Sequence, residues 1–177
     1  MKYLFFGFVL VFALSCGTKV PYTTEIRDEF GLDNDKALAK VQFYNSATIV
    51  LERSKESGNQ GTSSGGALVT NSSKEQDRVI VPIGTKGLFE EIDEDGNLVI
   101  RFEPGVGHTL KFGQRAGQSS GKYYLLADWT NKKGGELTFA NQTYYATTAS
   151  GSAYVQVVKK KLQKTKRRDR VVKGMKV

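Results

Sequence analysis

Carboxylates and one histidine are the side chains of this sequence with the right types for acid–base chemistry. Five acids fall between residues 90 and 95: Glu90, Glu91, Asp93, Glu94 and Asp95. A pair of carboxylates can act as the acid and the base of a hydrolase. These acids surround Asp95-Gly96, a strong turn dipeptide, so we interpret them as the solvated rim of a hairpin. They do not form a calcium loop, because position twelve counted from Asp93 is Pro104 and not glutamate.

His108, the single histidine, lies between glycines in "EPGVGHTLKFG". A catalytic histidine needs a nucleophile or an orienting partner, and the sequence marks neither. One histidine and one cysteine exclude paired-histidine zinc sites and multi-cysteine metal sites. The stretch also lacks the Gly-Lys-Ser/Thr ending of a phosphate-binding loop. We therefore predict no catalytic residue, no metal ligand and no cofactor.

The single cysteine, Cys16, follows an apolar run at the start of the chain. Met1-Lys2 is a short positively charged segment, and residues 3–14 are almost all apolar. The run is too short to span a membrane, which takes about 20 residues, but it fits the hydrophobic region of a signal peptide. We predict a signal peptide over residues 1–15. An ordinary secretory signal cut nearby, with Cys16 as a free thiol, is the alternative.

The stretch "ALSC" (13–16) resembles the lipobox of bacterial lipoproteins, a resemblance that covers residues 1–17. Ser15 matches the small residue before the cysteine, and Ala13 stands where the family more often has leucine. Such proteins are cut just before the cysteine, which is then lipidated on sulfur and acylated on its new amino group. The resemblance implies that Cys16 carries three acyl chains, and two or more chains give stable membrane attachment.

The residues after Cys16 bear on the membrane to which the protein is sent. Gly17 follows, so no aspartate resembles the inner-membrane retention signal of lipoproteins. No acidic cluster resembles the signals that some lipoproteins use for export to the cell surface. We therefore expect a lipid-anchored protein of the bacterial cell envelope, on the periplasmic face of an outer membrane.

Positive charge is concentrated at the C-terminal end. Residues 159–176 contain ten Lys/Arg and one acid, whereas the whole chain carries +8. Such a block is typical of a solvated interaction segment, and we expect a basic tail over residues 163–177. An exported protein meets acidic headgroups, the cell wall and acidic partner proteins rather than nucleic acid. We predict that the tail binds an acidic partner through Lys159, Lys160, Lys161, Lys164, Lys166, Arg167, Arg168, Arg170 and Lys173.

The first third of the mature chain predicts a tether, two short helices and a strand. Residues 16–24 are expected to form the lipidated tether. "TTEIRDEFG" (23–31) predicts a helix capped by Thr24 and ended by Gly31, and "DNDKALAK" (33–40) predicts another capped by Asp33. Residues 41–54 predict one strand, or a hairpin broken near Asn45-Ser46. Residues 54–66, rich in Gly and Ser, predict a polar loop.

Strands are predicted for most of the remaining domain. In "GLFEEIDEDGNLVIRFEPG" (87–105) the clearest hairpin turns at Asp95-Gly96, and parity places Leu98, Ile100 and Phe102 on the buried face. In "KYYLLADW" (122–129) parity places four residues together: Tyr123, Leu125, Ala127 and Trp129. The last three strands, within residues 136–162, form a predicted meander with turns near Asn141 and at Ser150-Gly151.

Two tyrosine pairs, Tyr123-Tyr124 and Tyr144-Tyr145, fall within these predicted strands. Neighbours on a strand point to opposite faces, so one tyrosine of each pair can enter the core while the other faces outward. Exposed tyrosines often anchor binding surfaces. Ordinary β-propensity explains the pairs equally well.

Residues 78–103 resemble the core of SH3-like barrels, with Gly84 and Gly87 in the place of the turn glycines. That resemblance implies a binding domain rather than an enzyme. About seven or eight short strands predict a mainly β fold, a small antiparallel barrel or sandwich over residues 25–162 that begins with one or two short helices.

Together these features predict a non-enzymatic adaptor or structural component of a membrane-associated assembly, for example a secretion machine. A lipid anchor, a basic tail and a β-rich body support that expectation. A cell-wall (peptidoglycan) binding module is the first alternative, suggested by the SH3-like stretch and the tail. A small periplasmic hydrolase that uses the hairpin carboxylates is the second.

Overall fold

The computed structural model of the chain describes residues 17–62 and 68–162. Within them the chain is mainly β, with two short helices near its start and two 3-10 turns. The elements are β1 (Lys19–Pro21), α1 (Thr24–Phe30), α2 (Asp35–Leu38), β2 (Gln42–Asn45), β3 (Ile49–Thr62), β4 (Leu68–Val81), β5 (Lys86–Ile92), β6 (Leu98–Arg101), β7 (Thr109–Gly113), β8 (Tyr124–Leu125), β9 (Gly135–Phe139), β10 (Gln142–Ala146), η1 (Thr148–Ser152), β11 (Val155–Val158) and η2 (Lys159–Lys161).

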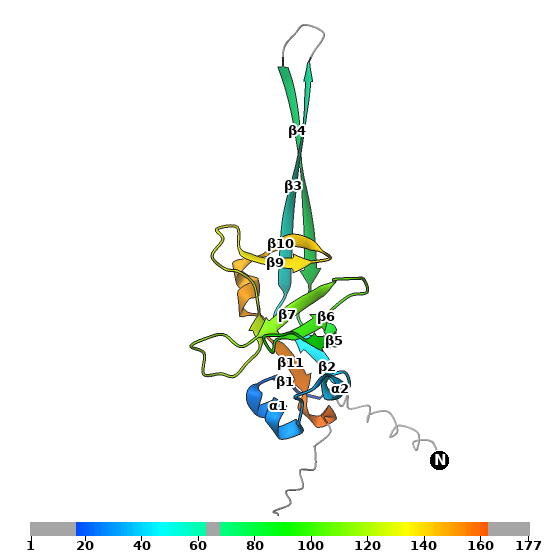
Figure 1. Ribbon diagram of the computed structural model, residues 1–177, viewed down its shortest axis with the longest axis vertical. Coiled ribbons are helices and arrows are strands. Elements are labelled where there is room, and N and C mark those ends of the chain that lie inside the picture. The colour runs from blue at the N-terminus through cyan, green and yellow to red at the C-terminus, as the bar shows by residue number, and fades with distance from the viewer. Residues whose placement is uncertain (1–16, 63–67, 163–177) are drawn as a thin grey trace, which may run out of the picture.

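These strands form two antiparallel sheets (Figure 1). The larger has the order β1-β11-β2-β5-β6-β7-β8, and the smaller has the order β4-β3-β10-β9. The larger sheet curls into a half-barrel. Its last strand, β8, lies beside the start of β11. Two hydrogen bonds join them: the Leu125 N–H donates to the Ala153 carbonyl (2.8 Å), and the Val155 N–H donates to the Tyr123 carbonyl (3.0 Å). The predicted class, a mainly β antiparallel fold with short N-terminal helices, is confirmed.

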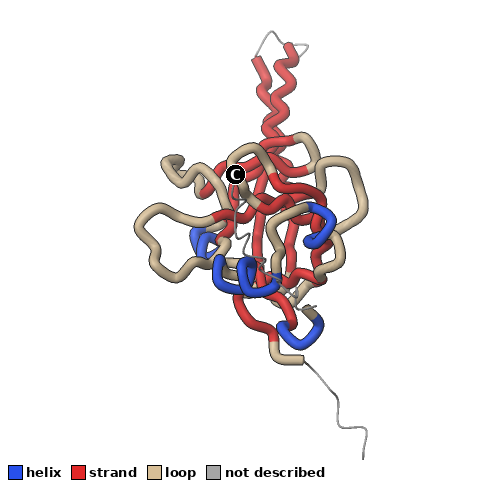
Figure 2. Tube along the Cα trace, turned by 60° about the horizontal axis from the view of Figure 1, so that its bottom comes forward, coloured by secondary structure: helices blue, strands red, loops and turns tan. Residues whose placement is uncertain are grey.

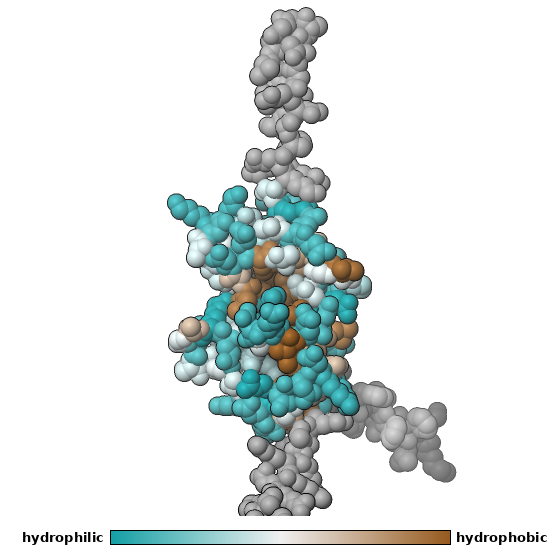
Figure 3. All heavy atoms as spheres, viewed as in Figure 1, coloured by the Kyte–Doolittle hydropathy of each residue, from teal (hydrophilic) through white to brown (hydrophobic). Residues whose placement is uncertain are grey.

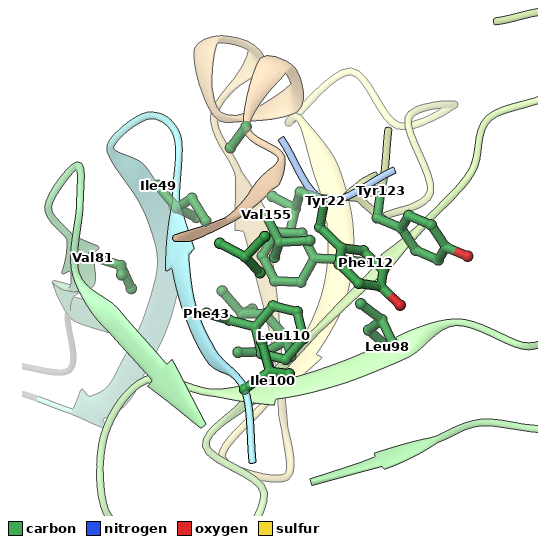
Figure 4. Close-up of a cluster of buried hydrophobic side chains, with 14 of the residues drawn as sticks. Tyr22, Phe43, Ile49, Val81, Leu98, Ile100, Leu110, Phe112, Tyr123 and Val155 are labelled. Carbon is green, nitrogen blue, oxygen red and sulfur yellow. The ribbon is translucent and has the colours of Figure 1, made fainter. Parts of the chain in front are cut away.

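One hydrophobic core joins the two sheets (Figure 4). Leu98, Ile100 and Leu125 are buried in it, as the strand parity predicts. Phe102 is only partly buried, because β6 ends at Arg101 and Phe102 lies beyond the paired strand. It still packs edge-on against Phe112, with ring centroids 6.0 Å apart. Phe102 therefore packs against the core from the predicted face, but it is not fully buried.

The segment expected as a tether contains part of the fold. Residues 19–21 form β1, an edge strand in which Val20 lies opposite Val157 of β11. An edge strand tolerates Pro21, which has no N–H to donate. Tyr22 is completely buried, and its hydroxyl donates to the Leu32 carbonyl (3.1 Å). Even Gly17 touches the body, since a Cβ added there would collide with the Val158 side chain.

The two predicted helices are present, and each begins one residue away from the expected position. Thr23, rather than Thr24, caps α1 by accepting from the Ile26 N–H (3.3 Å). Asn34, rather than Asp33, caps α2 by accepting from the Ala37 N–H (3.0 Å). Gly31 ends α1 in the left-handed conformation at φ 61°, as predicted, where glycine has no Cβ to clash.

Residues 41–54 divide between the two sheets instead of forming one strand or a hairpin. β2 pairs with β11 and β5, whereas β3 pairs with β4 and β10. The chain changes sheets at Asn45, whose buried amide donates to the carbonyls of Ala47 and Pro82, both at 2.8 Å. This side chain therefore ties the corner after β2 to the corner after β4.

The prediction of a polar loop over residues 54–66 is also wrong, because residues up to Thr62 belong to β3. β3 and β4 pair along their whole length, from Ile49 opposite Val81 to Thr62 opposite Leu68. They form a two-stranded ribbon that stands clear of the body in two views (Figures 1 and 2). A ribbon with water on both faces needs no alternation of apolar residues, so its sequence looks like a loop.

Interactions at the ribbon's base attach it to the smaller sheet. Asp77 of β4 accepts hydrogen bonds from the Tyr144 hydroxyl (2.7 Å) and from Arg53 Nη2 (3.0 Å). The Tyr144 hydrogen bond, opposed by partial burial and assisted by Arg53, lowers the pKa of Asp77. Beyond this point no other described strand pairs with the ribbon, since β10 pairs with β3 only at Leu51 and Glu52.

The end of the domain is a hairpin followed by a change of sheet, and not a three-strand meander. β9 and β10 form the predicted hairpin, with Ala140 and Asn141 at positive φ in its turn. The chain then passes through η1, where the buried Ser150 hydroxyl accepts from the Val50 N–H (2.9 Å). β11 inserts between β1 and β2 of the larger sheet. The predicted turn at Ser150-Gly151 is therefore a bridge between the sheets.

Candidate functional site

The predicted anchor and tail fall mostly outside the described residues, but the elements that lead to them lie together. Cys16 precedes the first described residue, and the predicted tail residues from Lys164 onward also lie outside the described residues. Lys19 of β1 is opposite Val158, after which η2 (Lys159–Lys161) begins. Lys159 Nζ forms an ion pair with Glu29 of α1 (2.8 Å). The segments that follow Cys16 and precede the tail therefore share one end of the body.

The hairpin carboxylates hold their own turn together. Asp93 Oδ1 accepts from the backbone N–H groups of Asp95 (3.1 Å) and Asn97 (2.9 Å), and Oδ2 accepts from Lys111 Nζ (3.0 Å). Burial alone would raise the pKa of Asp93, but the hydrogen bonds from Asn97 and Lys111 outweigh it and lower the pKa. A carboxylate held ionised by its turn has no proton to give to a substrate. The described residues also contain no group of three or more potential metal ligands.

We expect Asp93→Asn to destabilise the protein at neutral pH by about 1 kcal/mol, since it weakens charge-assisted hydrogen bonds. Because the folded-state pKa is lowered, the stabilisation by Asp93 is present above about pH 4 and is lost as pH falls through the folded pKa. Urea unfolding at pH 7 and at pH 3 measures the difference, which should shrink in acid. Glu94→Gln, at an exposed neighbour, is the control, and an equal loss at both pH values would contradict the assignment.

His108 has an orienting partner that the sequence did not reveal, but no nucleophile among residues 17–62 and 68–162 makes a hydrogen bond to it. Its Nδ1 lies 2.7 Å from a Glu103 carboxylate oxygen, and its ring lies 5.2 Å from that of Phe139. Gly105 makes room for the ring, because a Cβ there would come within 2.7 Å of it. These contacts close the loop between β6 and β7.

A groove lined by aromatic and basic side chains is the best candidate for a binding site. It has a volume of about 500 Å³ and lies between the loop after β7, the loop after β8, and η1. Arg115 is one of its lining residues, and its guanidinium carbon lies 4.9 Å from the Tyr124 ring centroid and 6.0 Å from that of Trp129. Arg115 Nη2 donates to the carbonyls of Leu125 (2.9 Å) and Gly151 (2.7 Å). The guanidinium is therefore held in a fixed position.

Trp129 owes its position to two glycines. A Cβ at Gly135 would lie 2.8 Å from the indole, and a Cβ at Gly151 would lie 3.0 Å from it. Both contacts are made at the six-membered ring, and 36% of Trp129 stays exposed. The strand parity that placed Trp129 with Tyr123 and Leu125 is wrong, because β8 ends at Leu125 and the alternation ends with it.

The remaining groove residues are polar residues and two glycines, and none of the residues lining the groove is acidic. Lys132 adds a second cation to Arg115. The neutral hydrogen-bonding side chains are Gln118, Asn131, Thr148 and Ser152. On the face seen in Figure 3, hydrophilic residues likewise cover most of the described surface.

Sequence reasoning found one member of this groove. The Tyr123-Tyr124 pair divides as predicted, with Tyr123 buried and Tyr124 partly exposed in the groove, and Tyr144-Tyr145 divides in the same way. No sequence signal pointed to Arg115, because its importance comes from carbonyls at residues 125 and 151.

The chain matches no family model, and neither a curated protein nor a solved structure is similar to it. Among the described residues, no helix combines the length and apolar character needed to cross a bilayer. The fold itself defines a mainly β, antiparallel class of protein with a curled sheet and a projecting ribbon.

Proposed function

We propose that this protein is a lipid-anchored, non-enzymatic component of the bacterial cell envelope that acts as an adaptor in a membrane-associated assembly. The lipobox-like "ALSC" supports the anchor at Cys16. The observation that carries the adaptor role is the β3–β4 ribbon, which projects from the body at the end away from β1 (Figure 1). Two 14-residue strands reach about 45 Å at roughly 3.3 Å per residue.

The contacts of residues 17–22 support an orientation of the body relative to the membrane. Because Gly17 and β1 are already packed against β11, a lipid on Cys16 would hold the body close to the headgroups. The ribbon then extends away from the bilayer. The exposed Lys160 and Lys161 would face the headgroups, where acidic lipids attract cations.

The distribution of charge along the ribbon supports the proposal that its outer half contacts a partner. Near the base, the register places Glu52 opposite Arg78, Lys55 opposite Glu75 and Glu56 opposite Lys74, and Arg78 Nε lies 3.2 Å from Glu52 Oε1. Residues 57–73 contain no charged side chain. Native edge strands usually carry charges that prevent association. An uncharged edge is instead suited to accept a strand of another protein.

We expect the replacement of residues 57–73 by Asn-Gly to leave the fold intact and to abolish partner binding. Glu56 and Lys74 would then flank a two-residue hairpin turn, a geometry that Asn-Gly favours. The melting temperature should stay within a few degrees, because the core lies in the body. A photo-crosslinker placed at Gln60 in intact cells should capture an envelope protein, and the same crosslinker at exposed Lys40 should capture none.

The charge-swapped variant Lys55→Glu/Glu75→Lys is the matched control, because it keeps the paired charges and the uncharged tip. It should bind partners as the wild type does. Equal crosslinking from Gln60 and Lys40, or full partner recovery by the shortened protein, would contradict the adaptor role of the ribbon.

The hydrolase alternative is not proposed, because Asp93 is engaged by its own turn. The resemblance of residues 78–103 to the core of SH3-like barrels stays a prediction. Its hairpin does form, with β5 paired to β6 and Gly96 at φ 81° in the turn.

A further inference from the structure

We propose that the groove around Arg115 binds an acidic glycan, with a sugar ring against Trp129 and a carboxylate on Arg115. This binding site is separate from the β3–β4 ribbon and does not depend on the ribbon's role. The groove volume of about 500 Å³ falls within the range of small-molecule sites, roughly 300–1,000 Å³.

Arg115 is oriented in advance for an anion. A guanidinium has five N–H donors, and the two on Nη2 are directed to the carbonyls of Leu125 and Gly151. No other described residue accepts from its Nε or Nη1. Tyr124 lies 4.9 Å from the guanidinium carbon and stabilises the charge through a cation–π contact. A carboxylate can therefore bind the remaining N–H groups without any rearrangement of the side chain.

Trp129 provides the surface for a sugar ring. Gly135 and Gly151 lie against the six-membered ring of the indole, while Trp129 lines the groove and 36% of the residue stays exposed. The C–H groups on one face of a pyranose carry partial positive charge, and an aromatic face carries partial negative charge. The two surfaces are complementary, and the contact also removes apolar area from water.

The other groove side chains fit hydroxyl groups and negative charge. Lys132 is the second cation, and no acid lines the groove. The two nearby carboxylates accept hydrogen bonds from neighbouring residues. Asp128 accepts from the Thr130 N–H (2.9 Å) and hydroxyl (2.7 Å). Glu136 accepts from Asn131 Nδ2 (3.2 Å). The amide of Gln118 and the hydroxyls of Thr148 and Ser152 can exchange hydrogen bonds with sugar hydroxyls. An acidic saccharide satisfies the aromatic, the cationic and the neutral polar side chains together.

Trp129 is the single tryptophan of the chain, so its fluorescence reports binding directly. The full-length lipidated protein in detergent is titrated with trigalacturonic acid, with its methyl ester and with tetraglutamate. We expect a saturable change with trigalacturonic acid, at least tenfold weaker binding of the uncharged ester, and no saturable change with tetraglutamate. Tetraglutamate tests the alternative that the groove takes an acidic peptide.

Two variants test the residues. Arg115→Gln should weaken trigalacturonic acid binding about tenfold or more, because charge-assisted hydrogen bonds are lost. Arg115 also holds the backbone through its two hydrogen bonds, so its replacement could act through the fold. Lys132 makes no hydrogen bond in the described structure. Lys132→Gln should therefore weaken binding several-fold and leave the melting temperature unchanged. Lys122→Gln, whose ammonium lies over Tyr154 outside the groove lining, is the control and should bind as the wild type does.

Any one of four results overturns the proposal. They are an absence of a saturable signal with trigalacturonic acid, equal binding of the ester, equal binding of tetraglutamate, and wild-type affinity in Lys132→Gln.

Discussion

Cys16→Ser should release the protein completely from the membrane fraction. Serine cannot accept the thioether-linked lipid, and two or more buried acyl chains supply the attachment that we propose. Fractionation of cells grown with labelled fatty acid measures both results, since the wild type should carry label in the membrane fraction and the variant should be soluble and unlabelled.

The control is Ala13→Leu, which brings the stretch before Cys16 closer to the lipobox pattern and should keep both label and membrane attachment. A washing step with high salt removes protein that adheres through the basic tail alone. A Cys16→Ser protein that stays in the washed membranes, or a wild type that takes up no label, would disprove the lipoprotein assignment.

Phe112→Ala should cost about 3–5 kcal/mol of unfolding free energy, the range for an aromatic side chain removed from a core. Phe112 has no exposed surface, and it lies opposite Leu98 of β6 and Leu125 of β8 (Figure 4). Its loss leaves a cavity between strands on both sides. Urea unfolding followed by circular dichroism measures the change in free energy.

Phe102→Ala is the matched comparison, because Phe102 packs edge-on against the same ring but is only partly buried. Its substitution should cost clearly less than that of Phe112, since it removes less buried area. If the two variants lose equal stability, the end of β6 at Arg101 and the exposure of Phe102 are wrongly described.

Elements defined by local turn and cap chemistry were predictable from the sequence. The β5–β6 hairpin forms around Asp95-Gly96, and α1 ends at Gly31, because the required backbone conformations are those that glycine adopts most easily. The β9–β10 hairpin likewise turns near Asn141. In each case neighbouring residues alone determine the structure.

Elements defined by distant partners were not predictable. Val20 belongs to a strand only because Val157 lies beside it, and the short segment around it carries no alternation of its own. Asn45 marks a change of sheet through carbonyls of residues 81 and 82, far along the chain. Residues 55–62 of the ribbon escaped prediction for the opposite reason, since a strand pair away from the core has no buried face to leave a pattern.

The residues of the groove were also hard to predict from the sequence, because distant partners position them. Tyr124 could be proposed as an outward-facing residue because strand neighbours alternate, and that proposal needed only two residues. Arg115 and Trp129 come from loops, and their positions depend on Gly135 and Gly151. A single sequence does not reveal that a glycine exists to make room for an indole from another loop.

The position of β11 determines when the larger sheet can be completed. It lies between β1 and β2, so the first two strands of this sheet are joined only through the last one. A chain emerging from the ribosome lacks this link until residues 155–158 have been made. Contacts between distant segments slow folding, because the chain ends must meet before the pairing is rewarded. The larger sheet can therefore be completed only after β11, the last of its strands along the chain, has been synthesised.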